Sequence, residues 1–372
     1  MKRIFLHAGQ PKTGTTAIQH FLGKNRKALL ACGYFFPREG LSHISNHGPL
    51  ILDILGAPNS ARHRGSAQRV AQAIRESPAP NAVISAERLY PYFRTCLAGG
   101  LRNAVVEYFL QMGVRTSILI YLRDDLARLN SAYIQHVKSF RSDASLHDYV
   151  RDEIKLEACH SRLPGLAVPP RVDVIFRPFN ISVQKGGAVR DFLLTIGLSE
   201  DEIATFEGES RVNDSLGPIA LEAARQTLAQ LKANEREPSL RQRTELRNAL
   251  FDLVRQESPE TSFYGMDARL RKFVDRTVRG DRDAFSRTIW GRDWIGVFEP
   301  EERPVNIFDP NRAEAGALQH YRRLLDGLRA AAATIMADEA EAKPPAPRRR
   351  EREDPKTAYA MSGFGAGERD RE

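Results

Sequence analysis

A loop near the amino terminus, between an apolar segment and an amphipathic helical pattern, constrains the fold of this chain more than any other feature. The apolar segment Ile4-Phe5-Leu6 runs into a loop that holds Gly9, Pro11 and Gly14, and Thr15-Thr16 begins the helical pattern. This order predicts a buried strand, a tight loop and a helix start, whose first backbone N–H groups lack intrahelical partners and lie at the positive end of the helix dipole. We therefore expect the loop to bind an anion such as phosphate.

The loop fits the Walker A pattern G-x-x-x-x-G-K-[ST] only in part. Gly9, Gly14 and Thr16 match it, but position 15 is threonine where the pattern has lysine. Lysine occurs instead at position 12, inside the loop, where its ammonium would reach a different part of the ligand. The alternative to an anion site is a tight turn rich in threonine and glycine that binds no ligand. This alternative gives no role to Lys12, which lies beside an open helix start.

The same loop closely resembles the phosphosulfate-binding loop of sulfotransferases that use 3′-phosphoadenosine 5′-phosphosulfate (PAPS). The resemblance implies that six residues contact this donor: Pro11, Lys12, Thr13, Gly14, Thr15 and Thr16. A six-residue match is far more specific than a spacing of glycines. It implies a P-loop-like nucleotide-binding fold.

A second block, Tyr121 to Tyr133, is similar to the 3′-phosphate motif of the same family. It follows the continuous apolar run Ile118 to Leu122, which is typical of a central strand buried on both faces. In the family, an arginine at the strand end and a serine eight residues later hold the 3′-phosphate, and these are Arg123 and Ser131 here. Arginine offers a planar fork matched to phosphate. The alternative for Arg123 is a salt bridge to one of the two aspartates that follow it.

The general base of such a reaction has one main candidate and two alternatives. Glu87 follows the short apolar strand Asn81 to Ser85, and the crevice outside the carboxyl ends of parallel strands is open to ligand. Carbohydrate-type sulfotransferases use a glutamate at a strand end, which Glu87 matches by position. The alternative for Glu87 is an acid that complements a helix dipole. His47 and His7 are the other candidate bases.

The alternation of apolar strands with helical patterns predicts an α/β fold, in which helices flank a central, mostly parallel sheet and the carboxyl half is helical. We expect one sulfotransferase domain over residues 1–338, divided into a nucleotide-binding core (1–198) and a mainly helical elaboration (199–338). Residues 339–372 contain almost no apolar side chains and are expected to form a disordered tail. The resemblance extends over about residues 1–300.

Several helices are expected from the same periodicity. One should run from Thr16 to Cys32 and another from Leu146 to Cys159, and two shorter helices should begin near Asp267 and Asp281. Trp290 and Trp294, four residues apart, would then face one side of a helix and pack in the core.

Composition constrains the partners and the compartment. The 55 Lys and Arg residues against 47 Asp and Glu residues give a net charge of +8, which suits an anionic ligand or acceptor but equally serves solubility. The three cysteines show neither zinc-site nor disulfide spacing, and His43 and His47 lack nearby carboxylates, so no metal site is predicted. No run of apolar residues is long enough for a transmembrane helix or a signal peptide, so we expect a cytoplasmic protein without a transmembrane segment. No specific nucleic-acid binding is expected.

The resemblance implies transfer of a sulfuryl group from PAPS to a hydroxyl or amine acceptor, with release of adenosine 3′,5′-bisphosphate (PAP) and without a metal ion. The expected acceptor is a carbohydrate or glycolipid, with an anionic glycan as one form. Two alternatives remain: a P-loop kinase that uses ATP and magnesium, and a nucleotide-binding module without activity. Thr15 in place of the Walker lysine, and Arg123 where a Walker B aspartate is expected, weigh against the kinase.

Overall fold

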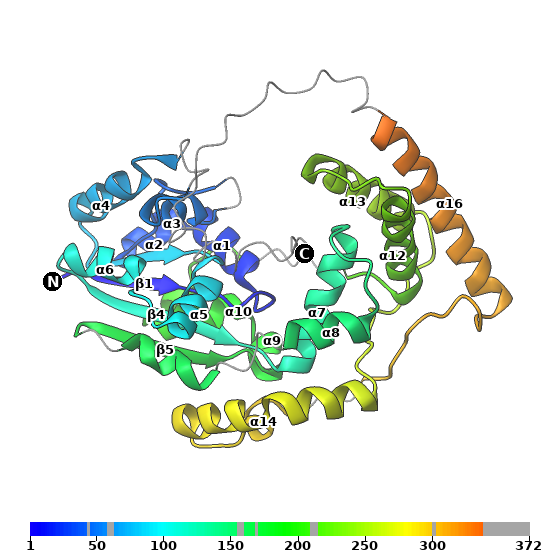
Figure 1. Cartoon of the computed structure of the whole chain (residues 1–372). Helices are drawn as coiled ribbons and strands as arrows, with labels where there is room; N and C mark the ends of the chain where they lie inside the picture. Colours follow the sequence, from blue (N-terminus) through cyan, green and yellow to red (C-terminus); the bar gives the residue numbers. More distant parts are fainter. Residues whose placement is uncertain are drawn as a thin grey trace.

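The computed structural model describes residues 1–42, 45–57, 63–154, 160–167, 170–208, 215–299 and 303–337. Its centre is a five-stranded sheet in the order β2-β3-β1-β4-β5, and every pair of neighbouring strands is parallel. The strands are β1 (Arg3–His7), β2 (Tyr34–Phe35), β3 (Asn81–Ser85), β4 (Arg115–Leu122) and β5 (Val172–Pro178). The predicted α/β class with a parallel sheet is therefore confirmed (Figure 1).

Helices cover both faces of the sheet, because its central strands are apolar on both sides. In β4, Ile118 and Ile120 belong to the core on one face, whereas Leu119 and Tyr121 belong to the core on the other. The first face is covered mainly by α3 (Gly48–Ile54), α4 (Ser66–Glu76), α5 (Leu89–Gly99), α6 (Ala104–Gln111) and the 3₁₀ helix η3 (His160–Ala167). The second is covered by α1 (Thr15–Lys24), α2 (Arg26–Ala31) and α10 (Ala188–Ile196).

A second group of helices lies beside the sheet rather than on its faces (Figure 1). It has its own apolar core and consists of α7 (Asp125–Lys138), α8 (Leu146–Glu153), α12 (Pro218–Ala233), α13 (Leu240–Arg255) and α16 (Ala315–Ala337). The long helix α14 (Ala268–Trp290) joins the two parts, since Val274 packs in the helical core and Phe285 packs in a core of the sheet. The remaining short helices are α9 (Ile181–Gly186), α11 (Glu200–Ala204) and α15 (Trp294–Phe298). The domain boundary near residue 198 stays a prediction.

The prediction of a single helix from Thr16 to Cys32 is wrong, because α1 ends at Lys24 and α2 begins at Arg26. Asn25 separates them. Its side-chain amide donates to the carbonyl of Phe21 (3.2 Å), and its side-chain oxygen accepts from the backbone N–H of Glu207 (3.0 Å). Asparagine competes for backbone groups in this way and so favours a helix end over a helix interior.

Two further helix predictions near the carboxyl end are also wrong. Two separate helices were expected at Asp267 and Asp281, but both residues belong to the start and interior of one helix, α14. The carboxylate of Asp281 does not cap a new helix: it accepts from the backbone N–H of His160 (2.7 Å) and lies 3.5 Å from the His160 imidazole. Gly291, with φ of 70°, ends α14, so Trp290 and Trp294 lie on successive helices. Their rings are still close, with centroids 6.1 Å apart, and Trp294 is 1% exposed, which confirms its place in the core.

Some sequence predictions fall outside the described residues. The helix that begins at Leu146 is described as far as Glu153, with Ile154 at its end, and the predicted continuation to Cys159 is not among the described residues. His43 and the predicted tail lie outside them as well. Among the helices that are described, none combines the length and the apolar character needed to cross a membrane.

Candidate functional site

Three neighbouring strands end at one edge of the sheet, and each is followed by residues that the sequence singled out. Strand β1 leads into the loop of residues 8–14, β3 leads to Glu87, and β4 leads to Arg123. After β1 the chain forms β2 at one edge of the sheet and then β3 between β2 and β1. It then crosses over and forms β4 and β5 on the opposite side of β1. The sheet therefore reverses its direction of growth at β1. The crevice outside the carboxyl ends of strands at such a point is where open α/β sheets bind ligands.

The loop after β1 has a shape suited to an anion. Lys12 and Gly14 both adopt positive φ angles, 75° and 77°, on either side of the buried Thr13. Alternation of this kind turns successive backbone N–H groups toward one side, which forms a concave anion site. Thr13 stabilises the turn, since its hydroxyl donates to the carbonyl of Gln10 (2.7 Å).

Both glycines of the loop are required by close packing. A Cβ at Gly14 would lie 2.7 Å from the Cβ of Ala188, and a Cβ at Gly9 would lie 2.2 Å from the hydroxyl of Thr15. Any side chain at Gly14 would also strain its left-handed backbone. The loop is thus held tightly between α1 and α10.

Helix α1 begins directly at this loop without a side-chain cap. Its first N–H groups therefore remain available at the positive end of the helix dipole. Thr16 is exposed at the helix start, whereas Thr15 is 3% exposed and its hydroxyl has no hydrogen-bond partner among the described residues. Thr16 can reach a ligand directly, and Thr15 lies beneath the loop.

Arg123 ties the end of β4 to the loop. Its guanidinium donates to the carbonyl of Lys12 (3.0 Å), and its backbone N–H donates to the side-chain oxygen of Gln10 (2.8 Å). Gln10 is fully buried, and its amide nitrogen donates to the hydroxyl of Tyr90 (3.2 Å). The guanidinium also lies 5.9 Å from the ring centroid of Phe179. Two motifs distant in sequence therefore form one structural unit.

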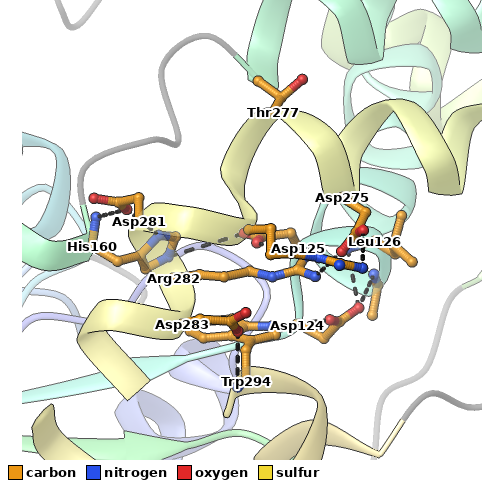
Figure 2. A network of polar contacts seen from close by, with 12 residues as sticks. Asp124, Asp125, Leu126, His160, Asp275, Thr277, Asp281, Arg282, Asp283 and Trp294 are labelled. Carbon is orange, nitrogen blue, oxygen red and sulfur yellow. Dashed lines mark hydrogen bonds and ion pairs between the residues drawn. The ribbon is translucent and has the colours of Figure 1, made fainter. Parts of the chain in front are cut away.

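The two aspartates after Arg123 have structural partners of their own (Figure 2). Asp124 caps α7 by accepting from the backbone N–H groups of Leu126 (3.0 Å) and Ala127 (3.2 Å), and it also accepts from the indole of Trp294 (3.2 Å). Asp125 is fully buried and lies 3.7 Å from the guanidinium of Arg282. These contacts, together with the imidazole of His160 at 4.0 Å from Asp125, anchor the turn that carries Arg123.

Lys12 extends from the loop toward the helical group. Its ammonium donates to the side-chain oxygen of Gln135 on α7 (2.8 Å). Burial and, to a lesser extent, the positive charges of Lys138, Arg123 and Arg247 lower the pKa of Lys12 to about 8. Lys12 therefore lies in a cluster of cations drawn from β4, α7 and α13. A bound anion would relieve their repulsion.

The negative charge of Glu87 opposes the lowering of the pKa of Lys12. Glu87 is half-buried, and burial raises the pKa of its carboxyl group, while the positive charge of Lys12 opposes that rise. The structure thus brings Arg123 and Glu87 close to Lys12 at the carboxyl edge of the sheet. A carboxylate with a raised pKa is a better proton acceptor than an ordinary one, which suits the role of base.

The two candidate histidines lie deeper. His7 and His47 are both fully buried and meet at Ser85: the hydroxyl of Ser85 lies 2.9 Å from Nδ1 of His7, and its backbone N–H donates to Nδ1 of His47 (3.3 Å). Burial lowers the pKa of each imidazole to about 3. Both rings are neutral at neutral pH but are not exposed to an acceptor, so the geometry favours Glu87. The identity of the base stays a prediction.

Ser131 lies half-buried in α7. It shares one face of the helix with Gln135 and Lys138, four and seven residues further on, and Gln135 contacts Lys12. Its assignment to a 3′-phosphate stays a prediction.

No group of three or more potential metal ligands occurs among the residues described by the structure.

Sequence reasoning missed four residues of this site: Gln10, Gln135, Lys138 and Arg247. Gln10 and Gln135 are neutral amides whose role is to hold Arg123 and Lys12, and no motif points to them. Helical periodicity from Ser131 could have placed Gln135 and Lys138 on the same face. Arg247 lies far along the chain, and only tertiary packing brings its charge near Lys12.

Comparison of the chain with models of protein families, with curated proteins and with solved structures gives no match in any of the three.

Proposed function

We propose that this protein is a sulfotransferase that moves a sulfuryl group from PAPS to a hydroxyl or amine acceptor and releases PAP. One observation carries the proposal: Arg123 and Glu87 lie close to Lys12, and the three residues follow the ends of three adjoining parallel strands. The resemblance of the loop to a phosphosulfate-binding loop links Lys12 to the phosphosulfate of the donor. The resemblance of the second block links Arg123 to the 3′-phosphate.

The donor would lie with its phosphosulfate on the loop and its 3′-phosphate near Arg123. Backbone N–H groups at the uncapped start of α1, the exposed hydroxyl of Thr16 and the ammonium of Lys12 supply donors for the first group. The guanidinium of Arg123 supplies a fork for the second. Because Arg123 also holds the carbonyl of Lys12, the two anionic groups would be bound by one connected unit.

The chemistry is an in-line displacement at sulfur. The acceptor oxygen or nitrogen forms a bond to sulfur, the bond between sulfur and the 5′-phosphate oxygen breaks, and its electron pair stays on the departing PAP. Lys12 and the loop amides stabilise the charge that gathers on that phosphate. The proton of the acceptor passes to the carboxylate of Glu87. As in phosphoryl transfer, positioning and charge stabilisation supply most of the rate.

Titration with PAP and with ATP, each with and without magnesium, tests the proposal against the kinase alternative. We expect PAP to bind equally well without magnesium and ATP to bind more weakly than PAP. Binding of ATP that requires magnesium and exceeds that of PAP would support a kinase. Transfer of label from radiolabelled PAPS separates an enzyme from a binding module without activity.

A further inference from the structure

A cavity of about 430 Å³, open at the surface, lies on one face of α13 and shares Arg247 with the cation cluster around Lys12. It is lined by Arg247, Asn248, Phe251, Asp252 and Arg255. Its size lies within the range of small-molecule sites. Its lining combines an amide, a carboxylate and two guanidinium groups around a single aromatic ring, which suits a ligand rich in hydroxyl groups that also carries negative charge.

A short series of contacts connects this cavity to the reacting centre. The ammonium of Lys12 donates to Gln135 (2.8 Å), and Lys138 lies one helical turn further along α7. The ammonium of Lys138 is 5.7 Å from the ring centroid of Phe251, and the guanidinium of Arg247 is 5.6 Å from the same centroid. The charges of both Lys138 and Arg247 lower the pKa of Lys12, so the cavity lies close enough to the reacting centre for its cations to act on Lys12.

The charge balance of this region is positive. Neither Lys12 nor Arg247 forms an ion pair with a carboxylate among the residues that the structure describes, whereas Arg255 is paired with Asp252. The Phe251 ring stabilises both neighbouring cations through its face and restricts where they can point. Arg247 is thus a preorganised cation without a carboxylate partner, directed at a polar cavity.

We propose that the face of α13 around Arg247 and Phe251 binds the acceptor, and that this acceptor is an acidic oligosaccharide. Arg247 pairs with a carboxylate or sulfate of the saccharide, and Asn248 and Asp252 hydrogen-bond its hydroxyl groups. This inference rests on the proposed sulfotransferase function and names the acceptor class for the same site. The hydroxyl to be modified then points past Lys138 toward Lys12 and Glu87.

Calorimetric titration of the full-length protein at saturating PAP tests the inference. The probes are a hexasaccharide of galacturonic acid and the neutral hexasaccharide of maltose-type glucose. The acidic probe should bind at least about tenfold more tightly than the neutral one, and Arg247→Gln should weaken it about tenfold, the effect of losing one charge-assisted hydrogen bond. Added salt should weaken the acidic probe in the wild type.

Arg241→Gln is the matched control, since it removes the same charge from an exposed site on the same helix where Arg241 pairs with Glu245. It should change the affinity by less than about twofold. Equal binding of the two probes, failure of the acidic probe to bind, or equal losses in the two variants would overturn the inference. Because PAP binding is measured first, failure of the proposed function appears there as a donor that does not bind, and it is distinct from failure at α13.

Discussion

The guanidinium of Arg123 donates a 3.0 Å hydrogen bond to the backbone carbonyl of Lys12. This bond joins the turn after β4 to the loop after β1, and the positive charge of Arg123 lies close enough to Lys12 to lower its pKa. Gln10 strengthens the connection by accepting from the backbone N–H of Arg123. The bond to Gln10 does not depend on the side chain of Arg123, so a substitution there keeps that part of the connection.

Arg123→Ala should weaken PAP far more than adenosine 5′-phosphosulfate, which lacks the 3′-phosphate. Loss of a charge-assisted pair costs about 1.5–3 kcal/mol, or roughly 10-fold to 100-fold in the dissociation constant. Calorimetric titration of both nucleotides with both proteins measures the difference. Any loosening of the loop would weaken both ligands alike, so a loss of equal size for the two would remove Arg123 from the 3′-phosphate site.

The protein should take up a proton when it binds PAP above about pH 8. In the free protein the pKa of Lys12 is about 8, so the Lys12 ammonium is mostly deprotonated at about pH 9. A bound phosphate raises that pKa and restores the charge, whereas the phosphates of PAP, with second pKa values of about 6, are already ionised. Titration in buffers of different ionisation enthalpy counts the protons, up to about one per site.

Lys12→Met should abolish that uptake and weaken PAP at neutral pH. A substitution at Lys24, which is exposed and paired with Glu207, provides the control and should leave the uptake in place. Proton uptake that persists in Lys12→Met would show that another group titrates on binding.

The sequence predicted the parts of the fold that follow from local pattern and missed those that depend on distant contacts. The apolar runs of β1 and β4 predicted the central strands of the sheet, and the glycines after β1 predicted the loop that leads into α1. The break at Asn25 depends on a hydrogen bond to Glu207, and the continuity of α14 depends on the contact between Asp281 and His160. Neither contact has a local signature.

The same distinction applies to the candidate site. Lys12, Glu87 and Arg123 could be named because each follows a recognisable strand, and parallel strands end at one edge of a sheet. The depth of His7 and His47 could not be predicted, since a polar residue at a strand end can face the crevice or the interior. The place of Arg247 depends on how α13 packs against α16 and α12, which no periodicity specifies.

Asp125→Ala should destabilise the protein strongly. The carboxylate is fully buried beside Arg282, which is 8% exposed, so its removal leaves a buried charge with less compensation. Breaking a buried pair in this way costs about 3–5 kcal/mol, and Asp275, a second partner of Arg282, should keep the loss toward the lower value.

Urea unfolding measures that loss, with Asp326→Ala as the control. Asp326 pairs with Arg329 on an exposed helix surface, so its removal should cost less than about 1 kcal/mol. Similar costs for the two variants would contradict the structural role assigned to Asp125.

The buried histidines should make the protein sensitive to acid. The pKa of His47 falls from 6.5 in the unfolded chain to about 3 in the folded one, so between these values the unfolded state binds a proton that the folded state does not. Stability therefore decreases as pH falls through this window, by up to about 1.4 kcal/mol per pH unit for each such histidine. His47→Gln should reduce that slope in urea unfolding measured from pH 6.5 downward.

The exposed His20 offers a comparison, because its side chain meets solvent in both states. His20→Gln should leave the slope unchanged. If His47→Gln has the same slope as the wild type, His47 is protonated in the folded protein and the assignment of a neutral buried ring is wrong.

Glu87→Gln separates catalysis from donor binding. It keeps the shape of the side chain and removes the proton acceptor, so PAP should bind nearly as before while the transfer rate falls by roughly 10²–10⁴-fold. His47→Gln and His7→Gln are the comparisons. If either histidine variant abolishes transfer with PAP binding preserved, while Glu87→Gln retains most of its rate, the base is that histidine.

The most direct test of the account is to incubate the wild-type protein with PAPS that carries radiolabelled sulfur, together with acidic oligosaccharides, in the absence of magnesium. We predict that label appears on the saccharide with release of an equal amount of PAP. Tight binding of PAP with no label on any acceptor would contradict the claim that this crevice transfers a sulfuryl group.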